Sequence, residues 1–152
     1  MQYLAFTFHK AGSMALHQHL GWLASVTGLP HHSANYENAE APGRHAFPDI
    51  ATVNDPDWWA RSGEGRDGIL GPLRRPVVLP DDLSARGVIC VRDPRDALTS
   101  MFFSFTFSHG GIPEELRARR SKMGIDKFAL RRAPDLKERL VAYRNLLSRH
   151  PD

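Results

Sequence analysis

The sequence predicts an α/β domain with a parallel sheet, and three features of the chain carry that prediction. Residues 3–8 form a short, mostly apolar run with aromatic side chains, which is typical of a buried strand. Residues 88–91 are continuously apolar and mostly β-branched, as expected for a strand covered on both faces. A helical pattern follows each run, and strands that alternate with helices indicate a three-layer arrangement with helices on both faces of the sheet.

The first strand leads into a turn of small residues and then a helix. His9 to Gly12 form the predicted turn, and from Ser13 onward apolar side chains recur at helical spacing. Gly28 and Pro30 are typical of a helix end. The spaced positions are Leu16, Leu20, Leu23 and Thr27.

The second strand is followed by clear signals for a helix start. Asp93 suits the N-cap, Pro94 suits the first helical position, and Asp96 lies in the first turn, where the helix dipole favours acids. We expect this helix to run to about residue 108, before Gly110 and Gly111. Its apolar face comprises Leu98, Met101, Phe102 and Phe105.

The rest of the chain gives weaker signals. Residues 77–79 predict a short strand, residues 125–131 a short helix, and Pro134 with Asp135 the start of a last helix. Residues 31–70, with seven acids against three arginines, are rich in turn-forming residues and predict long loops with short elements. The apolar face of the last helix comprises Leu136, Leu140, Tyr143 and Leu147.

Length and composition bound the class of protein. A chain of 152 residues with 41% hydrophobic and 24% charged residues corresponds to one globular domain, and excludes wholesale disorder, collagen and coiled coil. The single cysteine, Cys90, excludes an internal disulfide framework and any CxxC motif. No apolar run approaches the ~18 residues that span a bilayer, and the first residues do not resemble a signal peptide. We therefore expect a cytoplasmic protein with no membrane partner.

Charge points to anionic partners without choosing among them. The net charge is +3 and the sequence pI is about 9.4. Residues 114–150 hold eleven Lys and Arg against five acids, an excess of six. The basic run in this region is interpreted as a solvated helix face, with contact to a phosphate or an acidic acceptor as the alternative. Its members are Arg117, Arg119, Arg120 and Lys122.

Two strand-to-helix turns are candidate anion sites, because ligands of parallel sheets bind beyond the carboxyl ends of the strands. In the first, small residues let backbone N–H groups approach a phosphate, the helix N-terminus adds positive dipole, and Lys10 adds a charge. The GxxxxGK[ST] spacing of a Walker A loop is absent. In the second, Arg92 at the strand end and Ser100, ~9 Å along the helix from Pro94, can hold one phosphate between them. The alternative for the second turn is a surface serine and an Arg92 paired with Asp93 or Asp96.

Both turns resemble motifs of the sulfotransferase family. Residues 6–13 read F-T-F-H-K-A-G-S, which is similar to the 5′-phosphosulfate loop written P-K-S/A-G-T-T/S. Residues 88–100 read V-I-C-V-R-D-P-R-D-A-L-T-S, which is similar to the 3′-phosphate motif, a strand followed by R-D/N-P-R/K-D-x-x-x-S. The order of the two motifs and the spacing from arginine to serine match. Residues 71–74 and 103–130 also resemble bacterial sulfotransferase domains.

This resemblance implies a P-loop NTPase-like sulfotransferase fold that binds 3′-phosphoadenosine 5′-phosphosulfate (PAPS) and releases adenosine 3′,5′-bisphosphate (PAP), without a metal. Lys10 would be the catalytic residue and would contact the bridging and leaving phosphate oxygens, while Arg92 and Ser100 would bind the 3′-phosphate. The acceptor would be a hydroxyl or amine of a small molecule or carbohydrate, with no nucleic acid as partner. The 5′-phosphate would be cradled by the backbone of Ala11, Gly12, Ser13 and Met14.

The chain departs from the family pattern in places. His9 stands for the family proline and Met14 for a Thr or Ser, and no motif identifies the general base, for which His9 and His45 are the candidates. His17 and His19 point to different sides of a helix, so we expect no zinc pair there.

The family commonly continues with a further strand and helices, so residues 1–152 would correspond to its N-terminal and central part. Strand edges and the apolar face of the last helix would then lack cover, and we expect self-association or a low melting temperature.

Rival interpretations remain open. One is a nucleotide-binding module of the same fold without catalysis, another a P-loop nucleotide phosphotransferase, and a third a nucleic-acid binder, which no motif supports. Trp58 and Trp59 are interpreted as loop anchors, or alternatively as a stacking surface for a sugar or an apolar acceptor. Phe103 and Phe107 either line the nucleotide or acceptor pocket that the resemblance implies, or pack under the last helices.

Overall fold

The computed structural model describes residues 1–32, 67–108 and 110–149 of the chain. Its strands are β1 (Gln2–Thr7), β2 (His31–His32), β3 (Gly68–Leu73) and β4 (Ala85–Cys90). Its helices are α1 (Ser13–Thr27), α4 (Pro94–Phe103), which continues into a π-helical turn at Ser104–Ser108, and α5 (Glu114–Arg149). The predicted first strand, turn and helix, and the helix predicted to reach residue 108, are confirmed.

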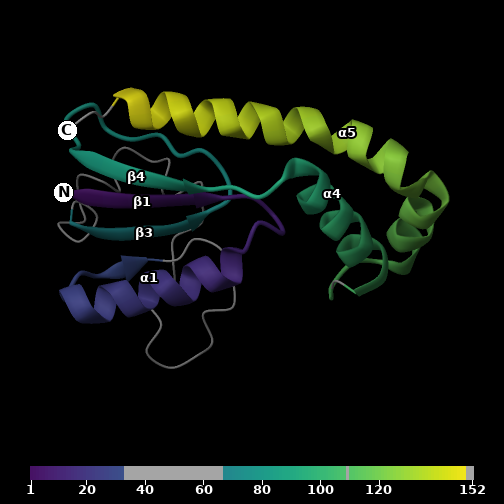
Figure 1. The fold of residues 1–152 in the computed structure, drawn as a ribbon, viewed down its shortest axis with the longest axis horizontal. Coiled ribbons are helices and arrows are strands. Elements are labelled where there is room, and N and C mark those ends of the chain that lie inside the picture. Colours follow the sequence, from purple (N-terminus) through teal and green to yellow (C-terminus); the bar gives the residue numbers. More distant parts are fainter. Residues whose placement is uncertain (33–66, 109, 150–152) are drawn as a thin grey trace.

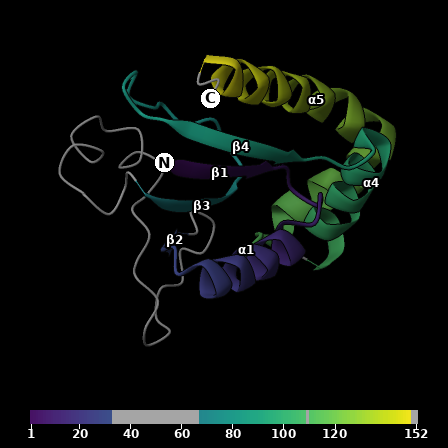
Figure 2. The ribbon, with the colours of Figure 1, turned by 60° about the vertical axis from the view of Figure 1, so that its left-hand side comes forward.

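The strands form a four-stranded parallel sheet in the order β2-β3-β1-β4 (Figures 1 and 2). β1 lies between β3 and β4, with Leu4 opposite Leu70 and Thr7 opposite Cys90. The predicted α/β class with a parallel sheet is therefore confirmed. Because all strands run the same way, the carboxyl ends of β1, β3 and β4 meet at one edge.

Helices cover both faces of this sheet, as Figure 1 shows with α5 and α1 on opposite sides. On one face, Leu20 of α1 packs against Ala5 and Ile69. On the other, Tyr143 of α5 is fully buried and its ring stacks on Phe6 with 4.6 Å between the centroids. The alternation of side chains along β1 thus supplies two separate cores.

The prediction that residues 88–91 are covered on both faces is wrong. β4 is an outer strand of the described sheet, and α1 packs mainly on β1 and β3, so the side chain of Val88 is 58% exposed. The strand predicted at residues 77–79 is also wrong: this segment is irregular, although Val77 and Leu79 are buried. β3, in contrast, lies in a region for which the sequence indicated loops.

The C-terminal region, labelled α5, comprises two helical segments that meet at a non-helical residue, Gly124. α5 changes direction at Gly124, where φ is 76° and ψ is 163°, and the helix predicted from residue 125 begins directly after it. Pro134 lies inside α5, so the prediction that it opens a new helix is wrong. The helix continues through Pro134 because the next turns are fixed by packing of Leu136 and Tyr143 on the core.

The expectation that the apolar face of the last helix lacks cover is also wrong for most of that face. Tyr143 is buried, Leu136 and Leu147 pack against the same core, and Leu147 closely approaches Gly87 of β4. Of the four predicted positions, Leu140 is the exposed one. Self-association stays a prediction. The apolar surface that it would involve lies on the α1 side of the sheet, where Val88 and Tyr3 are exposed.

Burial of Tyr143 predicts a loss of stability at alkaline pH. Burial raises the pKa of the Tyr143 hydroxyl from 10.0 to about 12. The folded state therefore holds this proton more tightly than the unfolded chain, so its contribution is complete below pH 10 and is lost as the pH rises towards 12. Urea unfolding from pH 9 to 12 should show this decline, and Tyr143→Phe should lack it. An equal decline in Tyr143→Phe would contradict the assignment.

Candidate anion-binding site

The turn after β1 brings backbone amides and a lysine to the carboxyl edge of the sheet. Lys10 adopts the left-handed conformation with φ 63°, which is uncommon for a residue with a side chain, and Gly12 follows with φ 84°. Two left-handed residues in a four-residue turn redirect the chain so that α1 can begin at Ser13. Strained backbone of this kind often marks a binding loop.

The N-terminus of α1 differs from that of α4. α1 has Gly12 as its N-cap, with no side-chain hydrogen bond to the cap and no acid in the first turn. At α4 the carboxylate of Asp93 accepts a hydrogen bond from the backbone N–H of Arg95, as predicted, and Asp96 lies in the first turn. Hydrogen bonds from the Arg95 side chain and backbone lower the pKa of Asp93 to about 2. Thus α4 carries its own anion, whereas α1 presents its positive end without one.

The structure brings the two predicted motifs together. The guanidinium of Arg92, just beyond β4, donates a hydrogen bond to the carbonyl oxygen of Lys10 at 3.1 Å. The thiol of Cys90 approaches the carbonyl oxygen of Ala11 at 3.5 Å. These two contacts join residues that are 82 and 79 positions apart in the sequence. The turns after β1 and β4 therefore lie together at one edge of the sheet.

The alternative partners of Arg92 are resolved in part. Of the two predicted acids, Asp93 pairs with Arg95 at 2.7 Å, and Arg92 has Asp96 as its partner. The Nε of Arg92 lies 4.0 Å from Asp96, and the Arg92 side chain is 46% exposed. An exposed pair at this separation is weak, which leaves the guanidinium able to turn to a stronger anion.

Arg74 is a residue of this edge that sequence reasoning did not assign to the site. It follows β3 directly, and its guanidinium donates to the hydroxyl of Ser13 at 2.8 Å, beside the start of α1. Arg139 of α5 in turn donates to the carbonyl of Arg74 at 2.8 Å and pairs with Asp135. The signal that could have found Arg74 is its place after a strand, but that strand was not predicted.

Arginines or lysines thus follow each of the three neighbouring strands at this edge: Lys10 after β1, Arg74 after β3 and Arg92 after β4. Lys10 is half-buried and forms no ion pair with any carboxylate in the described part of the chain. Together with the amides of α1, these groups make an edge suited to a multiply charged anion.

Ser100 lies two turns further along α4 and is half-buried. Its hydroxyl forms no hydrogen bond with the described residues. Met14, in the first turn of α1, is 55% exposed, so it lies at the surface of the turn without adding a hydroxyl there.

The aromatic residues of α4 and the π-helical turn form two groups, one in contact with His9 and one exposed. Phe105 lies in the π-helical turn, with its ring 5.3 Å from that of His9. Phe103 and Phe107 stack on each other at 6.0 Å and are both more than half exposed, so they do not pack under the last helix.

The basic run is not simply a solvated face. Arg117 donates to the carbonyls of Ile112 and Phe107, and Arg120 donates to the carbonyl of Phe105. These bonds join α5 to the end of the π-helical turn. Arg119 and Lys122 are exposed, and of these two Lys122 fits the interpretation of a solvated face, whereas Arg119 lines a cavity with three other arginines.

The predicted roles of histidines stay untested. His17 packs against His31 at 5.3 Å between ring centroids, while His19 bonds to the carbonyl of Ala15, so the two side chains point to different neighbours, as expected.

Within residues 1–32, 67–108 and 110–149, no three His, Cys, Asp or Glu side chains gather as metal ligands, and no helix has the length and apolar character to cross a membrane. Three positions considered in the sequence analysis lie outside the described residues: His45, Trp58 and Trp59.

Comparison of the chain with protein-family models, with curated proteins and with solved structures finds no match in any of the three.

Proposed function

We propose that the chain is a sulfotransferase domain that binds PAPS at the edge formed by Lys10, Arg92 and the N-terminus of α1. The observation that carries the proposal is the hydrogen bond from Arg92 to the Lys10 carbonyl, because it joins the two motifs that resemble the 5′-phosphosulfate and 3′-phosphate sites. A parallel sheet with both motifs at its carboxyl edge is what a P-loop-like sulfotransferase fold requires.

The residues at this edge suit such a donor. The N-terminus of α1 begins at Ser13, where an anion gains from the helix dipole, and the Lys10 ammonium can lie beside the bridging oxygen. The backbone amide of Ala11, which the resemblance assigns to the 5′-phosphate, donates instead to the carbonyl oxygen of Phe8 at 3.2 Å. Arg92, with Ser100 on the same connection, is assigned to the 3′-phosphate of the ribose. Arg74 holds the Ser13 hydroxyl and so positions the first residue of α1.

The chemistry asked of these residues is electrostatic. The donor supplies the sulfuryl group, whose bond to the bridging phosphate oxygen breaks as its bond to the acceptor oxygen or nitrogen forms. Negative charge therefore grows on the leaving phosphate, where Lys10 and the amides are preorganised to stabilise it. The acceptor proton passes to a base, for which His9 beside Lys10 is a candidate.

A nucleotide-binding module of the same fold, without transfer activity, is the second candidate. The exposed Met14 favours it, because that position offers no hydroxyl to the phosphosulfate. Such a module would bind PAP and AMP with the same preference as the enzyme but would transfer no sulfate.

Lys10→Ala is expected to lower the rate of sulfate transfer at least tenfold, because it removes more than ~1.4 kcal/mol of transition-state stabilisation. The measurement is transfer of radiolabelled sulfate from PAPS to a panel of hydroxyl and amine acceptors. Lys137→Ala, an exposed lysine of α5, is the matched control and should keep wild-type rates.

Unchanged transfer in Lys10→Ala would refute the assignment of this loop. If the wild-type protein binds PAP but transfers no sulfate to any acceptor, the binding-module alternative is favoured.

A further inference from the structure

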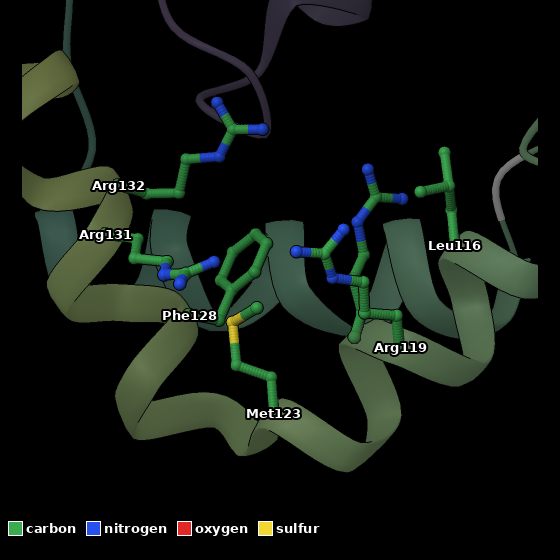
Figure 3. Close-up of a pocket in the computed structure, with 7 residues that line it drawn as sticks. Leu116, Arg119, Met123, Phe128, Arg131 and Arg132 are labelled. Carbon is green, nitrogen blue, oxygen red and sulfur yellow. The ribbon is translucent and has the colours of Figure 1, made fainter.

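We propose that a pocket formed at the kink of α5 binds a second, small anion of the phosphate or sulfate ester class. The cavity has a volume of about 320 Å³ and is lined by four arginines around an apolar floor of Phe128 and Met123 (Figure 3). The arginines are Arg119, Arg120, Arg131 and Arg132. None of them belongs to the edge assigned to PAPS, so the proposal stands independently of that function.

The kink at Gly124 makes the pocket. Its φ of 76° and ψ of 163° are accessible in practice only to glycine, and they turn the second part of α5 against the first. Figure 3 shows Arg119 on one arm and Arg131 and Arg132 on the other, with Phe128 between them. Without the kink, residues 12 apart on a helix would be ~18 Å apart along its axis.

Two of the arginines are held in place by neighbouring groups. Arg120 donates to the carbonyl of Phe105 at 3.2 Å, and its guanidinium carbon lies 5.5 Å from the centre of the Phe105 ring. The guanidinium of Arg132 lies 6.0 Å from the centre of the Phe128 ring. Phe128 is itself buried against Phe102 and Met101 of α4, so these cations rest on a fixed surface.

The charge of the pocket is not neutralised within the protein. In the described part of the chain, no carboxylate forms an ion pair with any of the four guanidinium groups. Asp135, the acid that follows on α5, pairs with Arg139, and no acid lines the cavity. Four like charges around one cavity repel one another, and a bound anion would reduce that repulsion.

The geometry points to the class of ligand. Guanidinium groups bind tetrahedral phosphate and sulfate groups through paired N–H donors, and the open arginines 119 and 131 supply them from opposite arms. The ring of Phe128 and the side chain of Met123 add an apolar surface, so an ester with a hydrocarbon or ring portion should bind better than the inorganic anion.

The test is calorimetric titration with inorganic pyrophosphate, phenyl phosphate and phenyl sulfate. It uses the full chain carrying Lys10→Ala and Arg92→Ala, which removes two of the three cations of the edge assigned to PAPS. In this background, adding Arg119→Gln and Arg131→Gln should weaken binding of each probe at least tenfold. Lys122→Gln, an exposed cation of the same helix that does not line the cavity, is the matched control and should change it less than twofold. The two phenyl esters, compared with each other, show whether phosphate or sulfate is preferred.

Gly124→Ala separates a built site from net charge, since it keeps every arginine and disturbs only the kink. We expect it to weaken pyrophosphate binding at least fivefold, with folding verified by circular dichroism. Equal binding in Gly124→Ala and its parent, or no effect of the arginine pair, would overturn the proposal. Neither result bears on PAPS, which is tested separately with Arg92 variants.

Discussion

Replacing Arg92 with alanine is expected to remove most of the preference of the protein for PAP over AMP. Arg92 donates a hydrogen bond to the Lys10 carbonyl in the loop that the proposal assigns to the 5′-phosphate, and its side chain is half exposed at the edge of the sheet. One charge-assisted arginine contact and one hydroxyl contact from Ser100 correspond to roughly 2–4 kcal/mol. That is about 30- to 1000-fold in affinity, and AMP binding should change little because AMP lacks the 3′-phosphate.

Arg95→Ala is the matched control for this experiment. Arg95 is the neighbouring arginine of the same motif, but its side chain is 88% exposed and pairs with Asp93, away from Lys10. Calorimetric titration of both variants with both nucleotides separates the two residues. If Arg92→Ala keeps the full preference, or if Arg95→Ala loses it equally, the assignment of Arg92 to the 3′-phosphate fails.

The largest effect on stability is expected for Tyr143→Ala. The Tyr143 side chain is fully buried, stacks on Phe6 and lies 5.6 Å from Phe8, and so joins α5 to the centre of the sheet. Removing a buried aromatic side chain costs about 3–5 kcal/mol in the free energy of unfolding, because its contacts are lost and a cavity remains. Urea denaturation of the variant and the wild-type protein measures this cost.

Tyr143→Phe tests whether the ring or the hydroxyl matters. The hydroxyl donates to the carbonyl of Thr7 at 3.4 Å, a long hydrogen bond, so we expect a loss of about 1 kcal/mol or less. A loss in Tyr143→Ala no larger than that in Tyr143→Phe would mean that α5 does not stabilise the sheet through this ring.

Much of the fold could be predicted because local signals and tertiary packing agree there. The apolar run at residues 3–8, the glycine after Thr27 and the Asp93-Pro94 start all act within a few residues, and the structure has β1, α1 and α4 accordingly. Where packing decides, the sequence misled. Gly71 and Pro72 weaken any strand pattern, yet β3 forms because it is paired on both sides, by β1 and β2.

The same competition explains the errors at the helices and the outer strand. Pro134 with Asp135 is a local signal for a helix start, but the packing of residues after it, including the buried Tyr143, keeps Pro134 inside α5. The pattern at residues 88–91 fits a central strand, but strand order is a property of the whole sheet and places β4 on the outside of the described strands.

The candidate site was predictable where a motif is continuous in the chain and not where it is assembled by the fold. Lys10 and Arg92 follow strands that the sequence signals, and their meeting at one edge follows from parallel pairing. Arg74 was missed with its strand, and the arginines of the α5 pocket converge only because of the Gly124 kink. Sequence spacing alone suggested that Arg119 and Arg120 share one solvated face.

The most direct test of the proposed function is the affinity of the wild-type protein for PAP compared with that for AMP, measured by calorimetry. If Arg92 and Ser100 bind a phosphate on the ribose, PAP should bind about 30- to 1000-fold more tightly than AMP. Equal affinities would show that the 3′-phosphate site does not exist, and would contradict the assignment of this edge to a sulfotransferase.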